Sequence, residues 1–203
     1  MQLVDALAIA LRQWDVRYVF GVSGANIEHL HDAVHRLGDG KLTAIMAKSE
    51  VGAAFMADCR ARVHRTLGVC CATSGGGMMN LAVGIAEAYT ESVPMLAIVG
   101  QVATSVETRG GFQDSCGVGR TVDAVGLFRS MSKYTARIDS GESFWSNFYE
   151  AVKSAMTGRQ GPAVLLIPRD VNELEVGEFP SWWPATLEEL AAPLAANDTD
   201  VRL

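Results

Sequence analysis

The sequence lacks the features that mark membrane proteins, secreted proteins and nucleic-acid-binding proteins. None of its apolar runs approaches the roughly 20 residues that a helix needs to span a bilayer. The segment Met1–Asp5 carries no basic residue, so it does not resemble the start of a signal peptide. The formal net charge of -6 is spread over 203 residues without a basic run, which argues against a nucleic-acid partner. We therefore expect a cytoplasmic protein without a membrane partner.

Cysteine is also scarce, and its spacing excludes the common cysteine-based sites. The four cysteines form no C-x-x-C pair and no metal-ligand spacing. Cys70 and Cys71 lie in an apolar run, where free cysteine behaves as a small hydrophobic residue. This usage fits a reducing compartment, which again indicates the cytoplasm.

A metal site within this chain is not expected either. The triplet Gly38-Asp39-Gly40 resembles the start of a magnesium and diphosphate site, which needs a downstream oxygen ligand, typically an asparagine. No asparagine occurs between this triplet and Asn80, and Gly-Asp-Gly is also a common turn. His29, His31 and His35 fall on one expected helix, where a solvated helix face is a more frequent explanation than a metal site.

The sequence does contain an alternation of apolar strands and amphipathic helices. Hydrophobic residues make up 49% of the chain and charged residues 20%, as in ordinary globular domains. Apolar runs predict strands at residues 18–22, 42–46, 67–72, 94–100, 133–138 and 163–167. Helical periodicity predicts helices at residues 2–14, 26–37, 78–89 and about 144–155, and one more marked by Val51, Ala54, Phe55 and Cys59.

Strands that are apolar throughout and separated by helices imply a parallel sheet with helices on both faces. About six strands in some 170 residues predict one α/β domain over residues 1–172, with three layers and a mostly parallel six-stranded sheet. Beyond Asp170 the composition shifts towards acidic residues and prolines, with the pair Trp182 and Trp183. We expect residues 173–203 to be a C-terminal arm that docks on a partner or is partly disordered. The alternative is that the tryptophans fold back on their own domain.

Three segments follow strands of the expected sheet and should meet at its carboxyl edge, where α/β proteins bind ligands. They are residues 23–26, 48–50 and 73–77. The Gly-rich loop at residues 104–119 is a fourth candidate, because long loops with little apolar content are often functional. Glu50 lies where a buried strand gives way to a helix, among small and apolar neighbours. A carboxyl group in such surroundings is suited to proton exchange with a bound heterocycle.

Each of these signals also has a simpler explanation. Glu50 fits equally as an ordinary carboxylate in the first turn of a helix, where the helix dipole favours it. The turn Thr73–Gly77 could bind phosphate through backbone N–H groups, but it matches neither a Walker loop nor G-x-G-x-x-G. Its glycines would also serve close packing between a helix and a strand.

Several segments in order resemble the N-terminal, pyrimidine-binding domain of thiamine-diphosphate enzymes, with the greatest similarity to the acetolactate synthase group. The resemblance covers residues 1 to about 172, and its motifs occur in the same order, which makes it specific. The matching segments are Val19–Asn26, Ser49–Asp58, Gly68–Gly77 with Asn80-Leu81, Ser92–Val102, Gly111–Gln113, Ser132–Tyr134 and Gly158–Val171.

The resemblance implies roles for particular residues. Glu50 matches the glutamate that hydrogen-bonds the aminopyrimidine ring of thiamine diphosphate and thereby helps the cofactor to lose its thiazolium C2 proton. Gly24 and Ala25 match the turn that lies against the pyrimidine. Phe112 and Gln113 match a pair that reaches the substrate, so Glu50 and Gln113 are the expected catalytic residues. The remaining cofactor-binding positions that the resemblance implies are Thr73, Gly76 and Asn80.

The sequence departs from the family pattern at three points. Gly76 replaces the usual proline of the Gly-rich turn, which implies a looser turn. Ser49 replaces the usual histidine before the glutamate and removes a nearby titrating group. Pyruvate-decarboxylase-like relatives carry a histidine pair after the fourth strand, whereas every histidine here precedes Arg65. The absence of that pair favours carboligation over simple aldehyde release.

The resemblance also implies that other parts of the enzyme lie outside this sequence. Members of the group continue into a middle domain and a third domain that binds Mg²⁺ and diphosphate, and neither occurs here. We therefore expect the pyrimidine-binding subunit of a two-component enzyme, a heterodimer or heterotetramer whose partner subunit supplies the Mg²⁺ and diphosphate site. FAD is not expected, because the flavin site belongs to the middle domain.

The expected reaction is decarboxylation of a pyruvate-like 2-oxo acid and ligation of the acyl-anion equivalent to a second carbonyl compound. One alternative is a split 2-oxo acid decarboxylase of the sulfopyruvate or phosphonopyruvate type. Another is a non-catalytic interaction protein that has kept the fold. A third is a nucleotide-binding module that uses the Gly-rich turn.

Overall fold

The centre of the protein is a six-stranded sheet in which all paired strands run parallel. The computed structural model describes residues 1–191. The strand order is β2-β1-β3-β4-β6-β5. The strands are β1 (Tyr18–Gly21), β2 (Thr43–Met46), β3 (Gly68–Ala72), β4 (Met95–Gln101), β5 (Tyr134–Arg137) and β6 (Pro162–Pro168). The predicted α/β fold with a parallel six-stranded sheet is confirmed.

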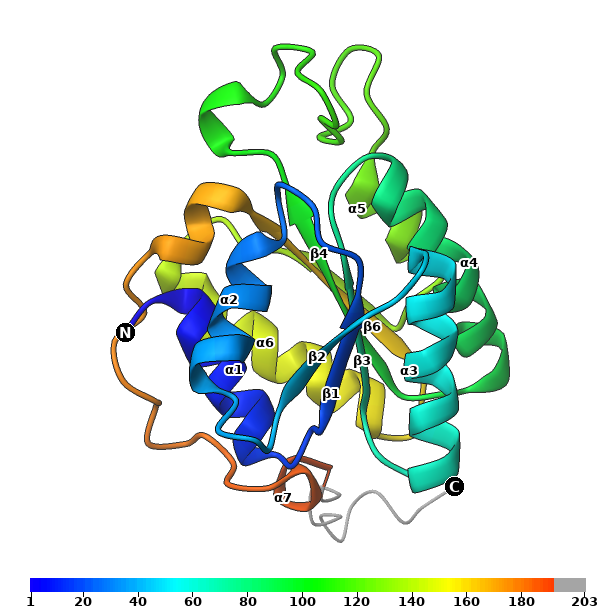
Figure 1. The fold of residues 1–203 in the computed structure, drawn as a ribbon, viewed down its shortest axis with the longest axis vertical. Helices are drawn as coiled ribbons and strands as arrows, with labels where there is room; N and C mark the ends of the chain where they lie inside the picture. The colour runs from blue at the N-terminus through cyan, green and yellow to red at the C-terminus, as the bar shows by residue number, and fades with distance from the viewer. Residues whose placement is uncertain (192–203) are drawn as a thin grey trace, which may run out of the picture.

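Helices cover both faces of the sheet, with α1, α2 and α6 on one face and α3, α4 and α5 on the other (Figure 1). The helices are α1 (Leu3–Gln13), α2 (Glu28–Leu37), α3 (Glu50–His64), α4 (Gly76–Glu91), α5 (Ala124–Arg129), α6 (Gly141–Met156) and α7 (Leu187–Ala191). Two short 3-10 turns are η1 (Thr104–Val106) and η2 (Arg169–Glu173). Within residues 1–191, no helix combines the length and the apolar composition needed to cross a bilayer.

Small residues bring α3 and α4 close together. A Cβ atom on Gly84 of α4 would lie only 2.4 Å from the Cβ of Ala54 in α3. The helix predicted from Val51, Ala54, Phe55 and Cys59 is present as α3, although Phe55 and Cys59 are exposed on it. A gap this narrow admits only small side chains, so larger ones point outwards. The buried positions of α3 are Ala53, Ala54, Ala57, Asp58 and Ala61.

The strand before Glu50 is an edge strand, which corrects the prediction of a buried one. Thr43 and Met46 of β2 are exposed, and the two residues between them are only partly buried. Within residues 1–191, β2 pairs with β1 alone, so no strand of this part lies on its other side. A short apolar run does not reveal whether a strand is central, because that depends on the strand order. Glu50 itself begins the next helix, as predicted.

The segment after β6 folds back along the first helix. Backbone hydrogen bonds of 2.8 and 3.0 Å tie Leu3 and Met1 to this segment. Trp183 stacks on Trp14, with ring centroids 4.9 Å apart and an angle of 14° between the rings. Trp182, by contrast, is 54% exposed. One tryptophan of the pair therefore packs on its own domain, and docking of the arm on a partner stays a prediction. The arm's last predicted residues, 192–203, lie outside the described part.

Candidate active site at the carboxyl edge of the sheet

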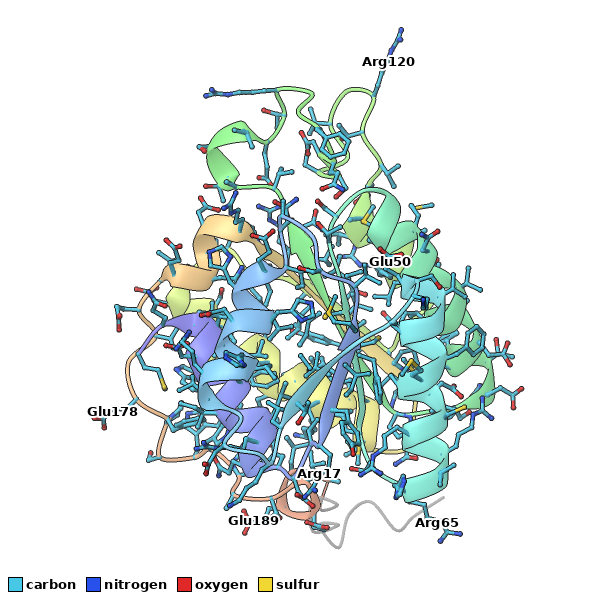
Figure 2. The ribbon with its side chains drawn as sticks, viewed as in Figure 1. Arg17, Glu50, Arg65, Arg120, Glu178 and Glu189 are labelled. Atoms are coloured by element: carbon cyan, nitrogen blue, oxygen red, sulfur yellow. The ribbon has the colours of Figure 1, made fainter. Side chains whose placement is uncertain are left out.

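Glu50 is the first residue of α3 and faces the start of α4 at the carboxyl edge of the sheet (Figure 2). Ser49 has an extended backbone and caps α3, because its Oγ accepts a hydrogen bond from the backbone N–H of Gly52 at 3.2 Å. This cap fixes where the helix begins and so places Glu50. Asn80 of α4 donates a hydrogen bond from Nδ2 to Glu50 Oε2 at 3.0 Å. Glu50 is half-buried.

The second carboxylate oxygen of Glu50 lies beside a glycine. A Cβ atom on Gly77 would lie 3.1 Å from Glu50 Oε1 and 2.8 Å from Thr73 Cγ2. Among residues 1–191, Oε1 accepts no protein hydrogen bond. The protein therefore fixes one oxygen of the carboxylate and leaves the other able to contact a ligand, an arrangement suited to sharing a proton with it.

Buried polar contacts join the turns that follow β1 and β3. The backbone N–H of Asn26 donates to Thr73 Oγ1 at 3.4 Å, and Asn26 Nδ2 donates to Ser74 Oγ at 2.8 Å. A Cβ atom on Gly24 would lie 2.8 Å from Thr73 Cβ, so the two turns are in direct contact. The sequence analysis placed Asn26 and Ser74 in two segments expected at this edge but assigned neither a role of its own. Each is a polar residue in a turn after a strand, but the sequence gives no sign that the two pair.

The loop after β4 places Gln113 on the Gly-rich turn. A Cβ atom on Gly75, whose φ is +64°, would lie 3.0 to 3.1 Å from Gln113 Cγ, Cα and Cβ. Gln113 itself has a φ of +65°, which is uncommon for a residue other than glycine and often marks a functional position. Phe112 is 89% exposed, so it is free of the core and able to contact a ligand or a partner.

Ala25 and Gly76 lie exposed at the same edge. Ala25 is exposed in the turn after β1. Gly76 is the first residue of α4, and a Cβ atom there would meet no atom within 4 Å. Both positions are therefore open to a ligand or a partner.

Burial keeps the titratable groups behind these turns neutral. His31 Nε2 lies 3.8 Å from Cys71 Sγ. Burial lowers the pKa of His31, and a hydrogen bond with the Val22 backbone only partly opposes this. Burial raises the pKa of Cys71 to about 12 and raises that of Cys70 as well. Because a thiol must lose its proton to act as a nucleophile, these cysteines have a packing role.

The other candidate sites lie apart from Glu50. Gly38-Asp39-Gly40 connects α2 to the amino end of β2, whereas Glu50 lies beyond its carboxyl end. His29 Nε2 contacts Glu173 Oε1 at 3.1 Å, while His31 faces Cys71, so the two histidines do not converge. In the described part of the chain, no three His, Cys, Asp or Glu side chains come together to hold a metal ion.

The carboxyl edge of the sheet brings together a half-buried carboxylate and two turns that follow neighbouring parallel strands. Glu50, whose Oε1 accepts no hydrogen bond from residues 1–191, and the touching turns at Gly24 and Thr73 suit the hydrogen-bonding edge and the flat face of an aminopyrimidine ring such as that of thiamine diphosphate. Residues 1–122 match the family model described as "Thiamine pyrophosphate enzyme, N-terminal TPP binding domain". The chain belongs to this family.

Relatives with curated names are acetolactate synthases. The chain is 35% identical over 182 residues to the probable acetolactate synthase large subunit of Methanocaldococcus jannaschii, which covers 89% of this chain and 29% of the relative. It is 35% identical over 186 residues to acetolactate synthase isozyme 2 large subunit of Escherichia coli, covering 92% of this chain and 32% of the relative. The chain thus spans about a third or less of the length of these relatives.

Proposed function

We propose that this protein is the pyrimidine-binding subunit of a two-component, thiamine-diphosphate-dependent enzyme. It acts on a pyruvate-like 2-oxo acid, and the enzyme ligates the acyl group left after decarboxylation to a second carbonyl compound. The observation that carries the proposal is the Glu50 carboxylate, with Oε2 held by Asn80 and Oε1 without a hydrogen-bond donor among residues 1–191. Membership of the thiamine pyrophosphate enzyme family supports it.

The residues of this chain would bind and orient the pyrimidine half of the cofactor. When bound, thiamine diphosphate supplies the carbon nucleophile and the electron sink for decarboxylation. Glu50 would share a proton with a ring nitrogen through Oε1, while Asn80 keeps the carboxylate in place. Gly24, Ala25 and Thr73 would lie against the ring.

Two further positions complete the proposed site. Gly76 would leave room at the start of α4, where a Cβ atom would meet no neighbour. Gln113 and the exposed Phe112 would contact the 2-oxo acid from the loop above the Gly-rich turn.

A partner subunit would complete the site and supply Mg²⁺ and diphosphate binding. Glu50 is only half-buried, so a second surface is needed to exclude water from the cofactor. The helices that begin at the site carry exposed apolar side chains, which commonly mark a protein interface. They are Phe55, Met56, Val63, Met79, Val83 and Tyr89. The relatives are more than three times as long as the matched segment, which is consistent with further domains in the active enzyme.

Reconstitution with the partner tests this function. The tagged chain is used to capture its partner from native extract, and the pair is assayed for thiamine-diphosphate-dependent consumption of pyruvate. Glu50→Gln should lower kcat by about 10²–10⁴-fold, because it removes a proton-transfer group. Glu150→Gln, an exposed residue of α6 on the opposite face of the sheet from α3 and α4, is the control and should leave kcat unchanged. Full activity of Glu50→Gln would refute the proposed role.

Product analysis separates the proposed reaction from its alternative. A 2-hydroxy ketone or 2-hydroxy acid formed by joining two carbonyl compounds would identify a carboligase. Release of an aldehyde as the main product would identify a decarboxylase instead. A captured partner without any thiamine-diphosphate-dependent turnover would leave the chain with an interaction role.

A further inference from the structure

The loop from Val102 to Asp123 is held in place by polar contacts and very little by apolar packing. It rises above the sheet between β4 and α5, and Figure 1 shows it as the highest part of the molecule. Its Val106, Phe112 and Val118 are 43%, 89% and 52% exposed. Hydrophobic burial therefore contributes little to fixing the loop, and its order must come from hydrogen bonds and ion pairs.

The strongest of these contacts joins the loop to the edge strand β5. Glu107 in the loop forms a two-pronged ion pair with Arg137 at the end of β5, and Arg137 Nη2 lies 2.9 Å from Glu107 Oε2. The side chains of Arg137 and Glu107 are 20% and 16% exposed. Those of the pair Arg36 and Asp32 are 42% and 61% exposed. Parallel hydrogen bonds between a guanidinium and a carboxylate fix the orientation of both groups, and partial burial limits screening by salt.

Three further contacts hold the base and the inside of the loop, and in one of them the buried Ser115 donates from Oγ to Gln101 Oε1 of β4 at 2.7 Å. Asp170, just after β6, accepts hydrogen bonds from the backbone N–H and the Oγ1 of Thr104, at 3.0 and 2.5 Å. Asp114 accepts from the backbone N–H groups of Thr108 and Cys116, at 2.9 and 3.0 Å. The loop is therefore fixed at its base. Within the loop, the carboxylate of Asp114, the residue next to Gln113, joins the backbone on both of its sides.

The position of Gln113 depends on these contacts. Gln113 lies on Gly75 of the Gly-rich turn. Phe112 is too exposed for apolar burial to fix the position of Phe112 and Gln113. The Asp114 and Ser115 contacts are adjacent to the proposed site, and Asp170 anchors only the first residues of the loop. The ion pair of Glu107 with Arg137 lies outside the site and joins the loop to a separate strand.

We propose that Glu107 and Arg137 are positioning residues, whose ion pair holds the loop so that Phe112 and Gln113 stay above the Gly-rich turn. Neither residue contacts the proposed cofactor position. Their effect on the reaction rests on the proposed function, whereas their effect on the loop does not. The two effects are therefore measured separately.

Limited proteolysis of the isolated chain measures the loop directly. Arg109 and Arg120 are exposed trypsin sites within the loop, and Arg120 extends away from the molecule in Figure 2. Glu107→Gln keeps the shape of the side chain and should speed cleavage at both sites about tenfold or more, since hydrogen bonds to charged groups are worth at least that factor. Arg36→Gln, which breaks an ion pair elsewhere, is the matched control and should leave cleavage at these sites unchanged. Urea unfolding of each variant separates loop opening from loss of the fold.

Kinetics of the reconstituted enzyme measure the consequence for the reaction. Glu107→Gln and Arg137→Lys should lower kcat/KM for the 2-oxo acid about tenfold, while the concentration of thiamine diphosphate needed for half-activation stays unchanged. Glu107→Asp, which keeps the charge, should recover part of the loss.

The outcomes separate the two claims. Cleavage of Glu107→Gln at the wild-type rate would overturn the positioning role, whatever the kinetics show. Faster cleavage with unchanged kcat/KM in an active enzyme would overturn its link to the substrate. If no partner gives an active enzyme, the proposed function fails, and the cleavage rates alone decide whether the ion pair holds the loop.

Discussion

Two neighbouring glycines at the start of α4 provide a matched test of the site's geometry. Gly76 and Gly77 receive the same substitution, to alanine, within the same helical turn. A Cβ atom on Gly76 would meet nothing within 4 Å. A Cβ atom on Gly77 would lie 2.8 Å from Thr73 Cγ2 and 3.1 Å from Glu50 Oε1. Only the second substitution therefore forces the site to change.

The expected difference in stability follows from two opposing effects. Replacing glycine by alanine within a helix gains up to about 1 kcal/mol. Overpacking at Gly77 costs about 1–3 kcal/mol, because Thr73 is itself held between Gly24 and Asn26 and has little freedom to move. Gly77→Ala should therefore be about 1–3 kcal/mol less stable than Gly76→Ala, since the helix gain is common to both.

Thermal unfolding of the isolated chain measures this difference. At about 2–4 °C per kcal/mol for a domain of this size, the Tm of Gly77→Ala should lie about 2–12 °C below that of Gly76→Ala. In the reconstituted enzyme, Gly77→Ala should also weaken thiamine diphosphate binding, because the added methyl group displaces Glu50 or fills the space beside it. Equal Tm values for the two variants, with equal cofactor binding, would refute the packing argument.

Three further predictions concern stability. Gly76→Pro should stabilise the chain by about 0.4–1 kcal/mol in thermal unfolding, because proline suits the first position of a helix and no neighbour is in contact with it; a lower Tm would contradict this. Asn26→Ala should lower the free energy of unfolding in urea by about 1–3 kcal/mol, because it leaves the buried Ser74 hydroxyl unpaired. The double variant with Ser74→Ala should recover part of this loss, and no recovery would argue against direct coupling of the two side chains. Because folding lowers the pKa of His31, the unfolded chain takes up this proton at a higher pH than the folded protein does, so the stability that neutral His31 contributes is present above pH 6.5 and is lost as the pH falls through the folded pKa. The free energy of unfolding of His31→Gln should therefore fall less than that of wild type between pH 7.5 and 5.5. An equal fall would exclude His31 as its source.

The order of helices and strands could be predicted because each apolar run is long enough to show its period. The boundaries of the strands and the start of α3 at Glu50 agree with the sequence pattern to within a residue or two. The short helix α5, with six residues, shows too little periodicity to be recognised. The sequence pattern does not indicate that β2 is an edge strand, because strand order is a property of the assembled sheet.

The composition of the site was less predictable than its location. Glu50 and the Gly-rich turn could be placed at one edge because the carboxyl ends of parallel strands lie together. The contact of Asn26 with Ser74 joins residues 48 positions apart, and that of Glu107 with Arg137 joins residues 30 apart. Such pairings depend on loop conformations that hydrophobic periodicity does not describe. The exposure of Phe55 likewise depends on how closely α4 approaches α3, which the sequence pattern does not describe.

The packing of the C-terminal arm has a spectroscopic consequence. The chain contains four tryptophans, and all of them, Trp14, Trp145, Trp182 and Trp183, lie in the one aromatic cluster where the arm meets α1 and α6. Intrinsic tryptophan fluorescence therefore reports on this cluster and is not complicated by emission from the carboxyl edge. A change in this signal on mixing with a partner would indicate movement of the arm, and a tryptophan introduced near Phe112 would add a separate reporter for the active-site loop.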